Sequence, residues 1–496
     1  MIKRAVGFFV FTLVSMLGQS DTKRIEPPRF WNDGDLSNWT TPVAALNVRP
    51  GHYSEEEYYS APAGDFVRTY PVYFPGREPA GYWEMLRNAT PEPLITPGTR
   101  TMAGWVAAGK RVFRELDIPY MRSYDPKFVE ILRDADKYKA LGGHPQEDGT
   151  VYALRWVPTS KGLALSLQDC GSCHSRIMPD GSTQDGAPHL DPGDGISGLF
   201  TSHTTPGFLE FYSPGETPAM VAWRFWAAPW VTNDINERFK STDIDSRDFG
   251  FVTGIVPRFN SSPFFPTKIP DLIGLKDRKY IDHTATHRLR SVEDLMRYAA
   301  LISCCDSADF GPYHMLTDEG RRIVYRFPDE LVFALGQYIF ALEPPQNPNR
   351  ADSRASAGKK IFDREGCGGC HTPPLYTNNK LTLAAGFTPP PDHPLRDDIL
   401  PISVGTDPNL ALKTRKGTGL YKVPSLRGVW YRELLGHDGS VKTLEDWFDP
   451  ARLNNDYVPS GFKGYKVTHR AVPGHEFGLK LSAEDKAALI AFLKTL

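Results

Sequence analysis

The sequence predicts a mainly α-helical protein with two similar units in tandem, long loops, and an N-terminal extension before the first unit. The five-residue pattern C-x-x-C-H occurs twice, which indicates two equivalent sites. The run Ala108–Phe113 (AGKRVF) also resembles the run Ala357–Phe362 (AGKKIF), so a similar segment precedes each site. The 43 glycines and 43 prolines among 496 residues favour long ordered loops between modest helices.

Composition and charge narrow the class of protein. The chain has 57 Lys+Arg and 59 Asp+Glu residues, a formal net charge of −2, so no general positive field attracts nucleic acid or an anionic membrane. Beyond the N-terminus, the best apolar run, 219–231, is interrupted by Arg224 and is too short to span a bilayer. We therefore expect a globular protein that binds no nucleic acid and does not span a membrane.

The first residues have the pattern of a secretory signal peptide. Lys3 and Arg4 form a basic start, and Ala5–Leu17 is an uncharged, mostly apolar run followed by small residues. We expect residues 1–20 to be a signal peptide and the mature protein to be periplasmic or otherwise exported.

The two C-x-x-C-H motifs carry the strongest chemical signal. Two thiols three positions apart can add to the two vinyl groups of one porphyrin, and the adjoining histidine can then bind the iron. A thioredoxin-like pair would not need the histidine, and a zinc site would need two further ligands near each pair. We therefore predict two covalently bound haem c groups. The residues that would hold them are Cys170, Cys173, His174, Cys367, Cys370 and His371.

The two remaining cysteines, Cys304 and Cys305, are adjacent. They could form a vicinal disulfide or be two thiols at the end of a buried helix. We prefer the two thiols, because free cysteine packs as a small hydrophobic residue, and we assign them no chemistry.

Two predicted helices mark the ends of the units. A helix is predicted over 328–342 from its apolar spacing, and a second over 482–496, which begins with the capping box S-A-E-D. An opening helix that leads into C-x-x-C-H and a last helix that packs across it is the layout of a small cytochrome c domain, which residues 350–496 resemble. The first unit, 100–345, has a much longer insertion before its motif, and the aromatic, proline-rich extension 21–99 is not assigned.

The sixth ligand of each iron decides whether that iron only carries electrons or also does chemistry. All nine methionines lie at or before Met315, so histidines are the obvious candidates in the second unit. We favour His475, in the loop before the closing helix, over His437. His393 and His469 are more simply explained as ordinary loop residues.

The first iron has two candidate sixth ligands, His189 and His203, of which we prefer His189. An open or water-bound iron is at least as well supported, and an open position is what peroxide or oxygen needs. Trp226 and Trp230 belong to a tryptophan-rich segment between the two motifs. Packing is the simplest explanation for them, and an indole that relays electrons between the haems is the alternative.

Outside the haem motifs, the segments Tyr421–Trp430 (YKVPSLRGVW) and His437–Asp446 (HDGSVKTLED) resemble the diheme cytochrome c peroxidase superfamily. This superfamily includes bacterial cytochrome c peroxidases, the diheme enzyme of methylamine utilisation and the diheme rubber oxygenases. The end of the chain, from Gly474 onward, looks most like the rubber-oxygenase branch. The likeness is good over 350–496 and thin over 100–345.

The resemblance implies that one haem, usually the first, reacts while the second relays electrons, with a tryptophan such as Trp226 or Trp230 between them. The chain departs from the peroxidases in two places. Ala451 stands where they carry a methionine, which makes two histidine ligands at the second haem a better fit. Arg432–Leu435 replaces the T-x-P-Y that shapes an inter-haem calcium site, which puts calcium in doubt.

Together these features predict an exported diheme c-type cytochrome that transfers electrons. The leading hypothesis is a peroxidase-type oxidoreductase, which reduces hydrogen peroxide or activates oxygen at the first haem. Electrons would come from a redox partner, such as a small cytochrome or a cupredoxin, through the second haem. The alternatives are a pure electron carrier without a substrate and a dioxygenase similar to the rubber oxygenases.

Overall fold

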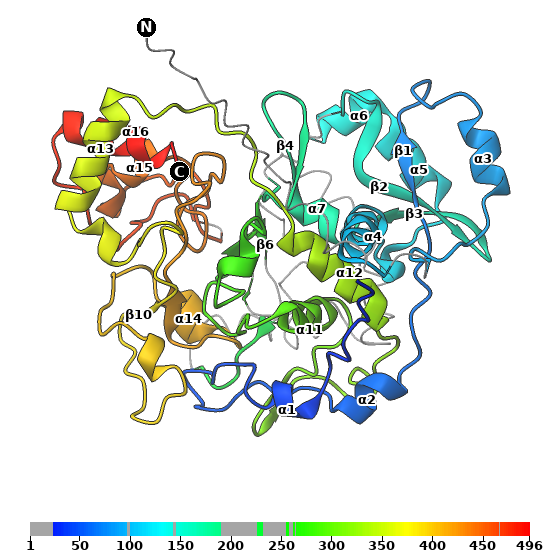
Figure 1. Ribbon diagram of the computed structural model, residues 1–496, viewed down its shortest axis with the longest axis horizontal. Coiled ribbons are helices and arrows are strands. Elements are labelled where there is room, and N and C mark those ends of the chain that lie inside the picture. Colours follow the sequence, from blue (N-terminus) through cyan, green and yellow to red (C-terminus); the bar gives the residue numbers. More distant parts are fainter. Residues whose placement is uncertain are drawn as a thin grey trace, which may run out of the picture.

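The computed structural model describes residues 23–96, 100–141, 145–189, 226–231, 254–256, 261–262, 264–465 and 467–496 (Figure 1). The predicted signal peptide, residues 1–20, lies outside this part of the chain, as does His203. The α-helices are α1 (Asp33–Leu36), α2 (Glu55–Ser60), α3 (Tyr82–Asn88), α4 (Met102–Glu115), α5 (Pro126–Arg133), α6 (Ala135–Ala140), α7 (Cys170–His174), α11 (Val292–Ser303), α12 (Asp329–Phe340), α13 (Ser353–Arg364), α14 (Asn409–Lys413), α15 (Leu444–Trp447) and α16 (Ala483–Leu493). The strands are β1 (Tyr70–Tyr73), β2 (Thr150–Thr159), β3 (Gly162–Leu167), β4 (Ser175–Ile177), β5 (Thr183–Asp185), β6 (Ile255–Val256), β7 (Thr267–Lys268), β8 (Asp309–Phe310), β9 (Tyr313–His314), β10 (Leu381–Leu383) and β11 (Leu420–Lys422). Two short 3₁₀ helices used below are η3 (Leu275–Asp277) and η4 (Cys367–Gly369).

Two pairs of helices cross in the same way, and each pair joins helices that lie far apart in the sequence. α4 packs on α12, and α13 packs on α16. At the first crossing Gly109 faces the main-chain carbonyl of Ala334, and at the second Gly358 faces that of Ala488. A Cβ atom on either glycine would overlap the facing carbonyl oxygen, so only glycine permits this close approach.

An aromatic pair follows each crossing, one turn further along the opening helix. Phe113 meets Tyr338 edge to face, with ring centroids 5.6 Å apart and planes at 61°. Phe362 meets Phe492 in nearly the same geometry, at 5.4 Å and 65°. The repeated run A-G-K-x-x-F therefore has the same structural role twice, with glycine at the crossing and phenylalanine against an aromatic residue of the closing helix.

Three of these four helices begin at a residue whose side chain caps them. Thr101 accepts a hydrogen bond from the main chain of α4, Asp352 from that of α13 and Ser482 from that of α16. α12 instead begins directly after Pro328, whose fixed φ suits an entry to a helix.

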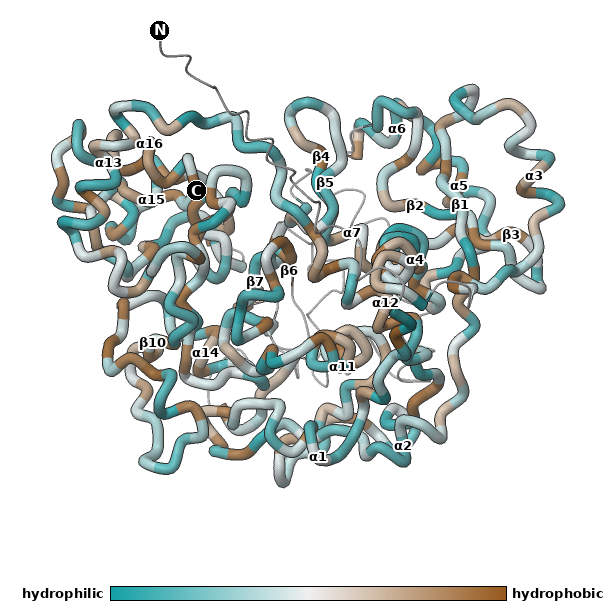
Figure 2. Tube along the Cα trace, in the orientation of Figure 1, coloured by the Kyte–Doolittle hydropathy of each residue, from teal (hydrophilic) through white to brown (hydrophobic). Residues whose placement is uncertain are grey.

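The N-terminal extension shares a core with the first helix pair. Trp31, Trp39 and Tyr58 are fully buried in one cluster with side chains of α11 and α12, and the Tyr58 hydroxyl donates to the carbonyl of Phe327 at 3.0 Å. β1 of the extension also forms an antiparallel sheet, in the order β1-β2-β3, with the hairpin of the long insertion. In Figure 2 the paler and brown stretches of α11 and α12 lie towards the centre. The extension is therefore part of the core that supports the first motif.

Small two-stranded sheets complete the described part of the chain. They pair β4 with β5, β6 with β7, β8 with β9, and β10 with β11. Within the described ranges no helix combines the length and the apolar character that crossing a bilayer requires.

Candidate functional site

Each C-x-x-C-H motif forms about one turn of helix. The first motif is α7 itself, and in the second, which begins in η4, the main-chain N–H of His371 donates to the carbonyl of Cys367 at 2.9 Å. Residues at positions i, i+3 and i+4 of a helical turn lie on one side, so each turn presents two thiols and an imidazole together. The four motif cysteines form no disulfide and are partly exposed. This is the arrangement that attachment of a porphyrin through two thioethers needs.

Main-chain carbonyls orient both motif histidines. Nδ1 of His174 lies 3.1 Å from the carbonyl oxygen of Pro270, and Nδ1 of His371 lies 3.2 Å from that of Tyr376. Only a protonated Nδ1 can donate to a carbonyl, so in each ring the lone pair belongs to Nε2. Burial also lowers the pKa of His371, which favours the neutral imidazole that binds iron.

A further histidine, His475, lies beside the second motif, and its role as a sixth ligand stays a prediction. The rings of His371 and His475 lie 6.3 Å apart, centroid to centroid, with planes at 56°. A metal–imidazole bond is about 2.0 Å long and a ring centroid lies about 1.1 Å from the nitrogen, so two imidazoles on opposite sides of one iron have centroids about 6 Å apart. Nδ1 of His475 is buried without a hydrogen-bond partner among the described residues, a cost that a bond from this nitrogen itself to a metal would offset. These residues fit a haem iron with two histidine ligands.

The loop that carries His475 is held by a buried arginine. Arg452, which is not exposed at all, donates to the carbonyl oxygens of Val472 at 2.6 Å, Gly474 at 2.8 Å and His475 at 3.0 Å. His475 has a left-handed backbone conformation, with φ of 48°, and its N–H donates to the carbonyl of Val404 at 2.6 Å. The position of the His475 ring thus depends on a charged group elsewhere in the unit.

The other histidines of residues 350–496 have contacts of a different kind. His437 stacks on Tyr421, with ring centroids 4.7 Å apart. His393 accepts a hydrogen bond through Nδ1 from the main chain of Leu395, and His469 pairs with the neighbouring Thr468 hydroxyl. The structure brings only His475 of these four into ring contact with His371 within the described residues.

His189 contacts the first motif, but in another manner. Its ring stacks on Tyr152 at 4.3 Å and 10°, its Nδ1 lies 3.2 Å from the carbonyl of Ser175, and its main-chain N–H donates to that of Cys173. Two of these contacts are with the main chain of the motif and its flank, and the third is with the ring of Tyr152 in β2. In the residues that the structure covers, no ring contact like that of the second site joins His189 to His174. The role of His189 as a sixth ligand stays a prediction.

Trp226 and Trp230 lie in an aromatic cluster. Trp230 meets Phe310 at 5.1 Å and Tyr313 at 5.2 Å, and both tryptophans pack against the cluster that contains Phe310 and Met315. These contacts are packing contacts, and a relay between haems stays a prediction.

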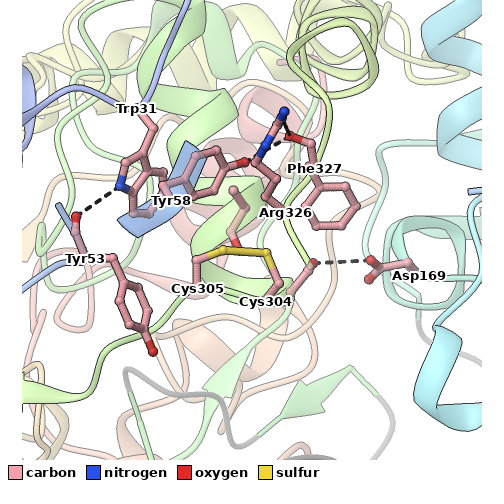
Figure 3. The surroundings of a disulfide bond; sticks show 10 residues. Trp31, Tyr53, Tyr58, Asp169, Cys304, Cys305, Arg326 and Phe327 are labelled. Carbon is pink, nitrogen blue, oxygen red and sulfur yellow. Dashed lines mark hydrogen bonds between the residues drawn. A yellow bond between two sulfur atoms is a disulfide. The ribbon is translucent and has the colours of Figure 1, made fainter. Parts of the chain in front are cut away.

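The structure joins Cys304 and Cys305 in a vicinal disulfide at the end of α11 (Figure 3). This corrects the expectation of two thiols, although Cys305 is fully buried as expected. α11 ends at Ser303 and the backbone of Cys304 is not helical, so the two adjacent side chains can turn to the same side. The Ser303 hydroxyl donates to the carboxylate of Asp169, which precedes Cys170, so the disulfide and the first motif meet in one core.

Sequence reasoning missed Arg452. It adjoins Ala451, which was considered only for the methionine that it replaces, and a buried arginine bonded to carbonyls leaves no periodic signal in the sequence.

As for metals other than haem iron, the described residues contain no group of three or more His, Cys, Asp and Glu side chains that could hold an ion.

No protein-family model matches the chain, and no curated protein matches it. Among solved structures, hydrazine synthase of Kuenenia stuttgartiensis, pressurised with xenon, is similar with a TM-score of 0.30 and 16% sequence identity, over 58% of this chain and 90% of that chain. A MauG-like protein associated with microbial copper homeostasis is similar with a TM-score of 0.29 and 17% identity, over 46% of this chain and 75% of that chain. At such TM-scores neither likeness bears on the argument.

Proposed function

We propose that this chain is an exported diheme c-type cytochrome, with one covalently bound haem c in each of two tandem cytochrome c-like units. The observation that carries this proposal is the repeat: each C-x-x-C-H turn accompanies a helix pair that crosses at a glycine, Gly109 in one and Gly358 in the other. A haem iron carries one electron between its ferric and ferrous states and, with an open position, also binds peroxide or oxygen.

The second unit is proposed to relay electrons. His371 and His475 would hold its iron from both sides, which leaves no position for a substrate. The separation of 6.3 Å between the two rings supports this role, as does the clamp of Arg452 on the His475 loop. A small cytochrome or a cupredoxin is the class of protein that would supply electrons to it.

The first unit is proposed to reduce hydrogen peroxide or activate oxygen. Its motif histidine, His174, would hold the iron from one side. The proposal gives the two haems different tasks, because it assigns a second histidine ligand to the second iron and an open position to the first. A carrier in which both irons are six-coordinate is the second candidate, and it predicts different spectra.

Electron paramagnetic resonance of the full-length holoprotein tests the proposal. The holoprotein would be matured in an exporting host that attaches haem c, and its spectra recorded as isolated and half-reduced. We expect one low-spin haem throughout and one haem with a high-spin ferric signal in at least one state, together with peroxide turnover by a reduced cytochrome donor. Two low-spin haems that bind neither cyanide nor carbon monoxide would leave only the electron carrier.

A further inference from the structure

A small cavity, partly open to solvent, lies between the supports of the two motif histidines. Pro270, whose carbonyl contacts His174, forms one part of its wall. Thr377 and Val423 form another part, and Thr377 directly follows Tyr376, whose carbonyl contacts His371. Any group bound in this cavity would therefore lie close to both candidate haem sites.

The cavity wall has an excess of positive charge. Four cationic side chains line it, and two carboxylates accompany them. The cations are Lys268, Arg278, Lys422 and Arg432. Glu433 is engaged elsewhere, because its carboxylate pairs with Arg176 at 2.8 Å. Asp271 is therefore the remaining carboxylate of the wall. It forms long ion pairs with two arginines, at 4.0 Å from Arg278 and 3.7 Å from Arg432.

The two lysines have only neutral acceptors. Lys268, at the end of β7, donates to the carbonyl of Leu434 at 2.9 Å. Lys422, at the end of β11, donates to the carbonyls of Ile281 at 2.6 Å and Tyr280 at 3.2 Å. Among the residues with described positions, neither ammonium group forms an ion pair. A half-buried ammonium group without an anion is costly, and desolvation lowers the pKa of both lysines to about 7.

The strands that carry these lysines, β7 and β11, are linked by hydrogen bonds through His283. The main-chain N–H of Lys422 donates to the carbonyl of His283, and Nε2 of His283 lies 3.2 Å from the carbonyl of Lys268. The two ammonium groups are thus fixed on one wall, and an oxyanion between them would satisfy both.

We propose that this cavity is an oxyanion-binding site, in which Lys268, Lys422 and the two arginines hold a carboxylate or phosphate group. Two sources could supply that group: the carboxylates of a porphyrin attached to the motif cysteines, or a free anion such as inorganic phosphate. The first source rests on the proposed function and the second does not.

The experiment compares full-length holoprotein with the variants Lys268→Met and Lys422→Met. Lys276→Met is the matched control, because Lys276 lies nearby in η3 but is exposed and outside the cavity. One arm titrates inorganic phosphate into each protein by calorimetry, and the other measures both haem midpoint potentials by spectroelectrochemistry. Haem content by mass spectrometry is measured first, so a failure of the proposed function is seen separately from a failure of the site.

If a free anion is the source, wild type and Lys276→Met bind phosphate and both cavity variants bind it at least tenfold more weakly. If the porphyrin is the source, phosphate does not bind. Both cavity variants then lower one haem potential by about 59 mV or more, a tenfold shift of a one-electron equilibrium, and Lys276→Met does not. Absence of phosphate binding together with potentials that follow the control would overturn the proposal.

Wild-type protein provides a second test if the variants do not fold. Porphyrin with ¹³C-labelled carboxylates can be followed by redox-difference infrared spectroscopy. Carboxylates held among four cations are expected to stay ionised between pH 5 and 8. A protonated carboxyl band in that range, in a protein that also fails to bind phosphate, would overturn the proposal without any variant.

Discussion

The guanidinium group of Arg452 donates a hydrogen bond of 3.0 Å to the main-chain oxygen of His475. It also donates to the carbonyls of Trp447, Val472 and Gly474, so one buried side chain closes the whole loop that presents the histidine. Because the backbone of His475 is left-handed, the loop depends on such bonds to keep this conformation.

Arg452→Leu should therefore release His475 from its position opposite His371. We expect the free energy of unfolding to fall by about 3 kcal/mol or more, since several charge-assisted hydrogen bonds are lost. In the holoprotein, the low-spin spectrum of the second haem should convert in part to high-spin. Arg427→Leu is the control, because that side chain is 49% exposed. An unchanged low-spin spectrum in folded Arg452→Leu protein would refute the positioning role.

The variant His475→Ala tests whether His475 or His437 is the sixth ligand of the second haem. Without this imidazole the second iron should become five-coordinate, and the capacity of the reduced holoprotein for carbon monoxide should rise by one haem equivalent. His437→Ala removes the stacking of His437 on Tyr421, at a cost of about 1 kcal/mol of stability, and should leave the spectrum unchanged. The reverse outcome would make His437 the ligand.

Gly109→Ala and Gly358→Ala test the two helix crossings. Each new Cβ would overlap a facing carbonyl, and we expect each variant to lose about 1–3 kcal/mol of stability through overpacking. The two losses should add, because the crossings lie in different helix pairs. Gly34→Ala in α1 is the control, since the nearest atom to its Cβ would be 3.6 Å away. Denaturant midpoints at constant m-value measure all three, and neutral alanines at the crossings would contradict the close approach.

The sequence predicted features that depend on local spacing. The helices α12 and α16 follow from apolar spacing and capping residues that lie close together in the chain, and the loop position of His475 just before α16 was read in the same way. The sheet that joins Tyr70 to Trp156 was not predicted, because pairing between distant strands has no signature within either strand. The core shared by the extension and α11 was missed for the same reason.

Contacts between buried polar groups could not be predicted from the sequence either. Arginine is usually found on protein surfaces. Arg452 is buried because the main-chain carbonyls of the folded loop point inward and accept its hydrogen bonds, which the sequence does not indicate. The disulfide of Cys304 with Cys305 depends on the backbone conformation just after α11, which no spacing rule specifies. The cationic cavity likewise combines residues from β7, β11 and the turns around them.

His52 should make the protein less stable in mild acid. Both ring nitrogens are buried without a partner among the described residues, and desolvation, with smaller contributions from His287 and Lys416, lowers the pKa of His52 to about 3. The unfolded chain takes up this proton near pH 6.5 and the folded chain does not, so stability falls as the pH drops from 6.5 towards 3.

Between pH 7 and pH 5 this proton alone should lower the free energy of unfolding by about 2 kcal/mol. His52→Phe keeps an aromatic ring against Trp31 and Trp39 and cannot titrate, so its pH 7 to pH 5 difference should be smaller than that of wild type by this amount. Urea denaturation at the two pH values measures it. Equal differences in the two proteins would show that His52 titrates normally in the folded state.

Alkylation of the denatured protein distinguishes cysteines that are free, joined in a disulfide or bound to haem. Of the six cysteines, four should be bound to haem and two should form the disulfide Cys304–Cys305. Denatured holoprotein should therefore take up no alkyl groups before reduction and two after it, as read from the intact mass. Two groups before reduction would mean that Cys304 and Cys305 are thiols, and four would mean that the haems are absent. The double variant Cys304→Ser/Cys305→Ser is the control: it should take up none in either state. It should also lose only about 1 kcal/mol of stability to chain entropy, because the disulfide closes so short a loop.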